Sequence, residues 1–334
     1  MNVPAKRVTR TSQPARLPHR TSIPVLGINV TFESNDAGPI AAAEDAFGAW
    51  RAVEQAPRLI STHKVSFRIH VEDGDEGNGD HTPLTYRQPD FTRVILQTPL
   101  SVGIADAARR EAVLYASRGF VEDRQHFRYG AIEALTLAVL TRLDRQPLRA
   151  ACIARGETAL LLAGRSGSGK STLAYAAAHD GYAILAEDYV NIQMDPRLRV
   201  WGTPGWLHLP VEAVRHFPEL EGREPVLRAN GKEKIAIRVA DLGAAPALPV
   251  AQRAGICVIE RSKGDDVVFE TLDAGRLQKA MTEQLDPEFD SFAETIGDAI
   301  RMLTAHGGWR LKLGADPRQA MKHIASMFKV LGGT

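Results

Sequence analysis

The sequence predicts an α/β protein whose main domain contains a mixed sheet, preceded by an N-terminal module that is mainly β. The first observation is the stretch Leu160 to Asp188, in which an apolar run, a glycine-rich loop, a helix-forming segment and a second apolar run end in two acids. The second is a hairpin pattern after these acids, which adds antiparallel strands to the sheet. The third is the region 23–120, where short strand-like segments outnumber helical patterns.

Length and composition bound the possibilities. The 334 residues suffice for one large or two ordinary domains, and an apolar content of 44% with 24% charge is ordinary for a globular protein. A net charge of +1 gives no general reason to expect nucleic acid or a membrane as a partner. No apolar run approaches the roughly 20 residues of a membrane span, and the N-terminus lacks the hydrophobic core of a signal peptide, so we expect a cytoplasmic protein. Cys152 and Cys257 lie in apolar runs without metal or redox spacing and are predicted to be buried, reduced thiols.

Residues 1–22 are predicted to form a disordered basic arm. They contain five Lys or Arg residues, show no periodicity, and no acid precedes Glu33. A contact arm for an acidic partner and a transit peptide are the alternatives.

Residues 23–122 are predicted to form an N-terminal α+β module. Ala41 to Gln55 has helical periodicity, and Lys64 to Val71 alternates as a half-buried strand. The loop Glu72 to Thr82 is rich in acids, but their spacing does not match a calcium loop, so a solvated turn is expected. Further strands are expected at 23–32, 84–86, 91–96 and 111–115.

Residues 123–334 are predicted to form the main domain. It begins with a long helix over Gln125 to Asp144 and a short strand over Leu148 to Arg155. The strand Thr158 to Ala163 leads into the glycine loop, and the hairpin pattern covers 189–201. Beyond the hairpin we expect helices at 210–216, 275–284, 291–305 and 317–330 and strands at 255–260 and 309–313. Residues 228–238 are expected to form a loop that contains Lys232 and Lys234, followed by a strand.

The glycine loop carries the clearest chemical pattern. Residues 164–171 match the P-loop (Walker A) pattern G-x-x-x-x-G-K-[ST], between an apolar strand and a helix. The glycines let successive backbone N–H groups point into one concavity that holds a diphosphate, Lys170 reaches the terminal phosphates, and the Ser171 hydroxyl can coordinate Mg²⁺. A glycine-rich turn at a helix start is the alternative. The expected nucleotide-binding residues are Gly164, Arg165, Ser166, Gly167, Ser168, Gly169, Lys170, Ser171 and Thr172.

Glu187 and Asp188 follow the second strand of this unit. The carboxyl ends of neighbouring strands share one crevice in an open α/β sheet, so the acids should face the phosphates. One carboxylate can hold Mg²⁺ and the other can take the proton of an attacking hydroxyl. Neighbours in an extended chain point in opposite directions, so only one of the two is expected to face the phosphate.

The order of glycine loop, helix, apolar strand, acid pair and hairpin resembles the kinase domain of HPr kinase/phosphorylase and its smaller serine-kinase relatives. The resemblance is good over about residues 148–203, looser to about 260 and weak over the N-terminal 120 residues. It implies ATP and Mg²⁺ as cofactors, Asp188, Lys170 and Glu187 as catalytic residues with Asp188 as the base, and Ser171 and Glu187 as metal ligands. Glu187 stands where the family usually has Asp.

The resemblance further implies an ATP-dependent kinase that phosphorylates a serine of a peptide or protein, such as a lasso-peptide precursor or a carrier protein. Arg149 stands where the family often has a histidine, and since arginine does not shuttle protons near neutral pH, this puts the reverse, phosphorylase reaction in doubt. Arg149, Lys232 and Lys234 are candidate contacts to phosphate or substrate. A homo-oligomer is also expected. The alternatives are a free-serine kinase and a nucleotide-binding regulatory protein without phosphoryl transfer.

Three histidines lie near these segments. His179 ends the helix after the glycine loop, where it can interact with the helix C-terminus. His208 and His216 are eight residues apart, which is no metal-ligand spacing, so surface or packing roles are expected.

Overall fold

The computed structural model describes residues 16–74, 83–227, 231–262, 264, 266–284 and 293–332. The chain divides into two compact units, Met1–Gly48 with Ile60–Leu140 and Ala49–Leu59 with Thr141–Thr334. This division places the helical residues after Arg124 with the first unit, whereas the sequence prediction began the second domain at residue 123. Most of the predicted N-terminal arm and of the loop Glu72 to Thr82 lies outside the described residues.

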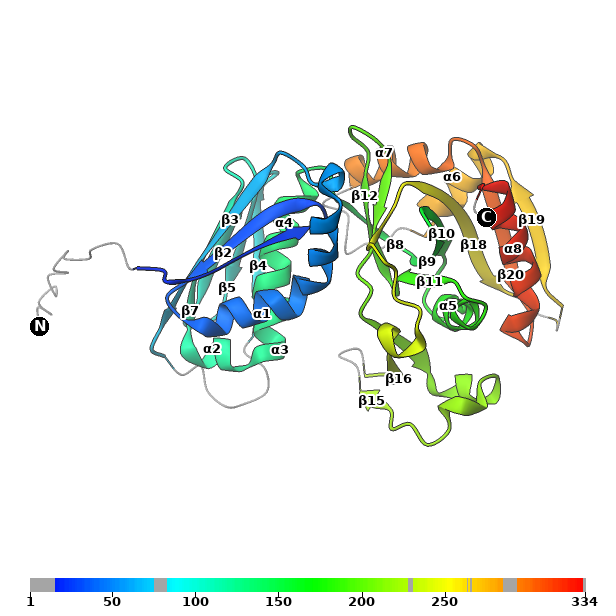
Figure 1. Cartoon of the computed structure of the whole chain (residues 1–334), viewed down its shortest axis with the longest axis horizontal. Helices are drawn as coiled ribbons and strands as arrows, with labels where there is room; N and C mark the ends of the chain where they lie inside the picture. The colour runs from blue at the N-terminus through cyan, green and yellow to red at the C-terminus, as the bar shows by residue number, and fades with distance from the viewer. Residues whose placement is uncertain are drawn as a thin grey trace, which may run out of the picture. The chain divides into compact units, whose positions relative to one another are not determined.

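A seven-stranded sheet forms the first unit, in the order β1-β2-β3-β7-β6-β5-β4 (Figure 1). β2, β3 and β7 run parallel to one another, and the other neighbours are antiparallel. This confirms the mainly β character predicted for the module. The strands are β1 (His19–Val25), β2 (Ile28–Ser34), β3 (Lys64–Glu72), β4 (Thr85–Asp90), β5 (Arg93–Gln97), β6 (Val102–Asp106) and β7 (Glu111–Ser117).

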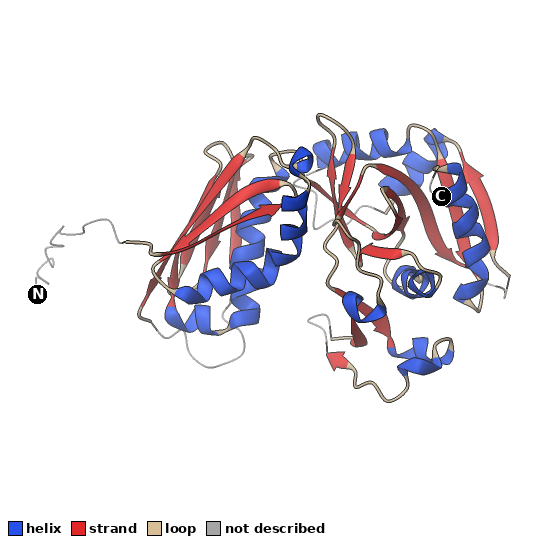
Figure 2. Ribbon diagram, in the orientation of Figure 1, coloured by secondary structure: helices blue, strands red, loops and turns tan. Residues whose placement is uncertain are grey.

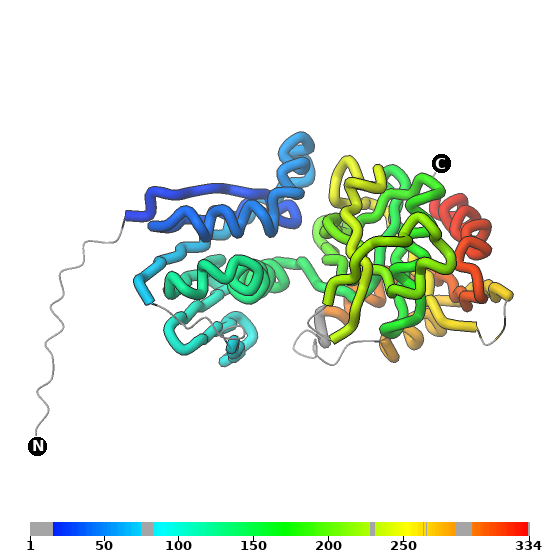
Figure 3. Tube along the Cα trace, turned by 90° about the horizontal axis from the view of Figure 1, so that it is seen from below, coloured from blue at the N-terminus to red at the C-terminus, as the bar shows by residue number. Residues whose placement is uncertain are grey.

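Helices cover one face of this sheet (Figure 2). The predicted half-buried strand Lys64 to Val71 is confirmed in β3, where Val65, Phe67, Ile69 and Val71 are buried and the residues between them reach solvent at least partly. Helix α1 lies beside the α3–α4 segment (Figure 3). The helical segments are α1 (Ala37–Phe47), α2 (Arg118–Glu122), α3 (Arg124–Phe127), the π-helical η3 (Arg128–Glu133) and α4 (Ala134–Thr141). The 3-10 segments η1 (Gly48–Gln55) and η2 (Pro57–Leu59) follow α1 in the chain, and from Ala49 on they belong to the second unit.

The single strand predicted over Ile23 to Phe32 is wrong, because this segment is a tight hairpin. Strands β1 and β2 pair from His19 opposite Ser34 to Val25 opposite Ile28. Leu26 and Gly27 form the turn with φ angles of 50° and 75°. Both angles lie in the left-handed region, as the turns that match the twist of a hairpin require. β1 also includes residues 19–22, which the sequence prediction assigned to the arm.

A six-stranded mixed sheet is the centre of the second unit, in the order β11-β9-β10-β18-β20-β19. β10, β18 and β20 are parallel, whereas β9 and β19 are antiparallel to their neighbours. The predicted mixed sheet is therefore confirmed. Its strands are β9 (Ala151–Arg155), β10 (Thr158–Ala163), β11 (Ala183–Ala186), β18 (Arg253–Arg261), β19 (Val268–Leu272) and β20 (Gly308–Leu313).

Two smaller sheets accompany it. The predicted hairpin is present as β12 and β13 within a four-stranded sheet of order β17-β13-β12-β8, and a three-stranded sheet has the order β14-β16-β15. The predicted strand Leu148 to Arg155 is divided at Ala150, so that β8 and β9 enter different sheets. The strands are β8 (Gln146–Arg149), β12 (Tyr189–Gln193), β13 (Arg199–Trp201), β14 (Trp206–Pro210), β15 (Val226–Leu227), β16 (Glu233–Arg238) and β17 (Val250–Ala251).

Both faces of the six-stranded sheet are covered. All six residues of β10 are buried, and its side chains alternate between two hydrophobic cores, one containing residues of α5 and α8 and the other residues of α6 and α7. Cys152 and Cys257 are buried and form no disulfide, as predicted. The remaining helical segments are α5 (Lys170–His179), η4 (Val211–Arg215), η5 (Pro218–Leu220), η6 (Val239–Leu242), α6 (Ala274–Thr282), α7 (Ala293–Thr304), η8 (Pro317–Ala320) and α8 (Met321–Val330). None of the helices in the described part of the chain is both long and apolar enough to span a bilayer.

Candidate functional site

The glycine loop connects the carboxyl end of β10 to the start of α5. Gly167 and Gly169 have φ angles of 82° and 103°, which residues with a Cβ atom adopt only with strain. A Cβ atom added to Gly164 would lie 2.5 Å from the carbonyl oxygen of Ile259 in β18. Each of the three glycines of the loop is thus required by the backbone, two by their conformation and one by close packing.

The start of α5 provides donors for an anion. The helix is capped by Gly169, which offers no side-chain hydrogen bond to the first-turn N–H groups. Ser168 in the loop is 7% exposed, and no hydrogen-bond partner for its hydroxyl is found among the described residues. Ser171 is the second residue of the helix and is half-buried. These groups fit a phosphate, with a hydroxyl beside it for a metal ion.

Lys170 folds back over the loop. Its Nζ donates to the carbonyl oxygens of Gly164 at 2.7 Å and Arg165 at 3.2 Å. Burial lowers the pKa of this ammonium from its ordinary value; Asp188 opposes the shift, and the positive charges of Arg149 and Lys234 add to it. The ammonium is therefore held against the loop, close enough to Asp188, Arg149 and Lys234 to interact with their charges.

The two acids after β11 point to different neighbours. The Asp188 carboxylate is half-exposed, with Oδ1 3.7 Å from Nε of Arg149. The Glu187 carboxylate accepts two hydrogen bonds from His208 in β14, one from the backbone N–H at 2.7 Å and one from Nδ1 at 2.6 Å. Since a carboxylate can only accept, Nδ1 carries a proton in this arrangement. Asp188 is thus the acid directed to the lysine side, as the alternation of an extended chain requires.

The role predicted for Glu187 as a metal ligand stays a prediction. Each of its oxygens accepts one hydrogen bond from His208, which fixes the carboxylate and leaves one lone pair on each oxygen for a cation. No cluster of three or more His, Cys, Asp or Glu side chains that could bind a metal occurs in the described ranges. A magnesium ion does not need one, because it usually keeps several waters and binds one or two protein oxygens together with substrate phosphates.

His208 was not recognised in the sequence as a residue of the site. It is buried, with 9% exposure, in the apolar segment WLHLP of β14. A histidine buried in such a segment needs a polar partner, and this need was the signal in the sequence that could have pointed to His208. The partner lies 21 residues earlier in the chain, and only the contact between β14 and the end of β11 shows the pairing.

Of the three candidate basic residues, Arg149 lies in β8, and Lys232 and Lys234 lie before and within β16. Arg149 ends β8, where it pairs in register with Tyr189, and its side chain lies against Asp188. Lys234 is in β16 opposite Pro210, and its charge reaches Lys170. Lys232 precedes β16 and is exposed. Arg149 and Lys234 are thus brought to the glycine loop, from two different sheets.

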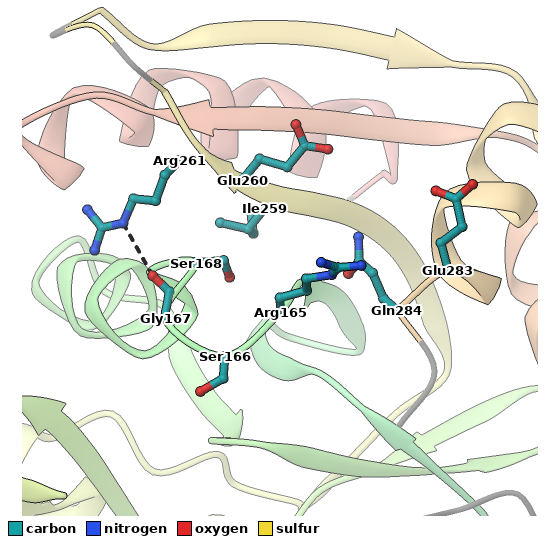
Figure 4. Close-up of a pocket in the computed structure, with 9 residues that line it drawn as sticks. All are labelled: Arg165, Ser166, Gly167, Ser168, Ile259, Glu260, Arg261, Glu283 and Gln284. Carbon is teal, nitrogen blue, oxygen red and sulfur yellow. Dashed lines mark hydrogen bonds between the residues drawn. The ribbon is translucent and has the colours of Figure 1, made fainter. Parts of the chain in front are cut away.

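A cleft of about 420 Å³ adjoins the loop (Figure 4). Arg165, Ser166 and Ser168 line it from the loop, and Glu260, Arg261 and Glu283 line it from β18 and the end of α6. The Nε of Arg261 donates to the carbonyl oxygen of Gly167 at 3.4 Å (Figure 4). This side of the loop is therefore open and carries carboxylates of its own.

Comparisons with known proteins give little beyond this geometry. No protein-family model matches the chain, and no curated protein matches its sequence. A solved structure, the HPr(Ser) kinase/phosphatase from Coxiella burnetii, is similar at a TM-score of 0.28 and 11% sequence identity, over 55% of this chain and 99% of that chain. A similarity at this level does not establish a shared fold.

Proposed function

We propose that the chain is an ATP- and Mg²⁺-dependent kinase that transfers the γ-phosphoryl group to a serine hydroxyl of a peptide or protein. One observation carries the proposal. A single edge of the six-stranded sheet brings together the glycine loop, Lys170 and Asp188, so that an anion-binding loop and a half-exposed carboxylate share one site.

The loop and the start of α5 provide the phosphate contacts. Backbone N–H groups of the loop and of the first helical turn hold the β-phosphate, and Lys170 exchanges its carbonyl partners for phosphate oxygens. The Ser171 hydroxyl and one carboxylate of the acid pair would hold Mg²⁺, which neutralises charge on the phosphates when it is bound.

Asp188 acts on the acceptor. Its carboxylate takes the proton of the attacking hydroxyl as the new bond from oxygen to Pγ forms and the bond from Pγ to the bridging oxygen of ADP breaks. Arg149, whose Nε lies 3.7 Å from Oδ1, keeps this carboxylate oriented beside the phosphates. The choice of a peptide or protein serine follows the resemblance of the sequence to HPr-type serine kinases.

The Asp188→Asn variant tests the proposal. General-base catalysis typically contributes about 10²–10⁴-fold, so transfer should fall by that factor, while ATP affinity stays within a few-fold because the loop is intact. ADP release with candidate peptides and mass spectrometry of the acceptor measure transfer, and calorimetry measures ATP binding. Asp180→Asn, an exposed acid just beyond the other end of α5, is the matched control.

Two results would contradict the proposal. Phosphorylation at the wild-type rate by Asp188→Asn would remove the base assignment. Tight ATP binding without phosphorylation of any peptide, protein or free serine would leave a nucleotide-binding protein that is not a kinase.

A further inference from the structure

A second cleft borders the glycine loop, with a volume of about 370 Å³. Gly169 and Thr172 line it from the loop and the start of α5, and Leu313 at the end of β20 and Pro317 beyond it line it from the other side. Segment η4 contributes Ala213 and Glu212. The cleft thus combines the start of an anion-binding helix with apolar walls, the composition typical of small-molecule sites.

The strand order places the β20 wall of this cleft across the sheet from Asp188. Within the sheet, β11 and its acids lie on one side of β10, whereas β18 and β20 lie on the other. A phosphate chain whose reacting end lies at Asp188 and whose middle lies in the loop must therefore continue toward the ends of β18 and β20.

Two clefts lie in that direction, and their chemistry differs. The cleft of Figure 4 carries the carboxylates of Glu260 and Glu283 beside Arg165 and Arg261, so its charges balance and it offers no net attraction to an anionic chain. The second cleft carries one carboxylate, Glu212, against Arg215 and Arg261, together with the apolar Leu313 and Pro317. A Cβ atom added to Gly169 would lie 2.7 Å from Leu313 and 3.6 Å from Nη2 of Arg261, so both side chains reach the loop.

His216 is a polar group on the wall of this cleft that has little charge at neutral pH. Burial and the nearby Arg215, Arg318 and Arg261 lower its pKa from the ordinary value, against the opposing effect of Asp316. A neutral imidazole can stack on or hydrogen-bond to an uncharged heteroaromatic ring.

We infer that the second cleft binds the ribose and base of the nucleotide, and so selects a nucleoside triphosphate over an inorganic polyphosphate. The inference rests on the proposed function, because it takes the reacting phosphate to lie at Asp188. Leu313 and Pro317 provide the apolar wall for the base, and Arg261 lies where the phosphate chain leaves the loop.

A pair of matched substitutions tests it. Glu212→Trp places a large ring at the second cleft, and Glu283→Trp makes the same change at the cleft of Figure 4; both glutamates are exposed. Mg²⁺-dependent binding of ATP and of inorganic tripolyphosphate to the full chain is measured by calorimetry. Glu212→Trp should weaken ATP binding by about tenfold or more and change tripolyphosphate binding by less than about twofold, whereas Glu283→Trp changes neither. Arg215→Trp, a second exposed substitution on the same wall, should repeat the effect of Glu212→Trp.

The outcomes separate this inference from the proposed function. Weaker ATP binding in Glu283→Trp alone, or unchanged ATP binding in all three variants, overturns the inference and leaves the kinase proposal standing. Equal losses for ATP and tripolyphosphate in Glu212→Trp and Arg215→Trp also overturn it. A wild-type chain that binds neither ligand overturns both.

Discussion

The sheets of the two units bury their side chains differently. In β3 of the first unit every second side chain reaches solvent at least partly, whereas in β10 of the second unit all six are buried. A sheet covered on both faces leaves only the ends of its strands for ligands, and the glycine loop and Asp188 lie there. A sheet covered on one face offers its other face instead. Burial pattern alone therefore indicates where each unit can act.

The largest expected effects test this difference directly. The side chains of Leu161 and Leu162 lie on opposite faces of β10, in separate cores. Leu161→Ala and Leu162→Ala should each lower the free energy of unfolding by about 2–5 kcal/mol, because each opens a cavity in one of these cores. In β3, Ile69→Ala should cost the same, but the adjacent Arg68→Ala should cost less than about 1 kcal/mol, since its ion pair with Glu111 is exposed. Chemical denaturation measures all four. Tolerance of either β10 substitution would mean that one face is not packed as described.

A half-buried carboxylate in the helical layer of the first unit, Glu133, is expected to give the next largest effect on stability. Burial raises the pKa of Glu133 to about 7 from 4.5, against the smaller opposing effect of Arg128, whose Nε lies 3.3 Å from Oε1. The folded unit therefore binds this proton more tightly than the unfolded chain. Stability falls as pH rises from about 4.5 to 7, by on the order of 3 kcal/mol, and is constant above that range with respect to this group.

Glu133→Gln removes this titration. The free energy of unfolding of the variant, minus that of the wild type, should rise between pH 5 and pH 8 by on the order of 3 kcal/mol. Urea denaturation at a series of pH values measures the difference. A difference that stays flat with pH would show that helix packing on the sheet does not dehydrate this carboxylate.

The smallest effects compare the two ends of β10. Gly156 and Gly169 both have positive φ angles, but an added Cβ atom has open space at Gly156 and lies 2.7 Å from Leu313 at Gly169. Gly156→Ala should lower the free energy of unfolding by about 1 kcal/mol. Gly169→Ala should lower it by about 1–3 kcal/mol and should also reduce the affinity for ATP. Thermal unfolding and calorimetry measure these. If Gly156→Ala lost as much ATP affinity as Gly169→Ala, ATP binding could not be assigned to the one edge of the six-stranded sheet that carries the glycine loop.

Local patterns predicted the glycine loop, its flanking strand and the hairpin after the acids. An apolar run such as Thr158 to Ala163 and a glycine motif are determined by neighbouring residues, so they can be read from sequence. The alternation in β3 was predictable for the same reason.

Contacts between distant segments were not predictable. The predicted strand is divided at Ala150 because β8 and β9 pair in different sheets, and the spacing of apolar residues does not indicate this division. The hairpin turn at Leu26 and Gly27 lacks the Asn-Gly or Asp-Gly sequence that usually indicates such turns. The bond between Glu187 and His208 depends on where β14 packs, so its residues looked unrelated in the sequence.

The contact of Gly164 with Ile259 has a consequence for ligand exchange. Because the loop starts against the backbone of β18, the conformational entropy of its first residue is lost when the sheet folds and not when a ligand arrives. Under the proposed function, an incoming polyphosphate would meet a loop whose start is already fixed, so selectivity would be expressed mainly in how slowly the complex dissociates.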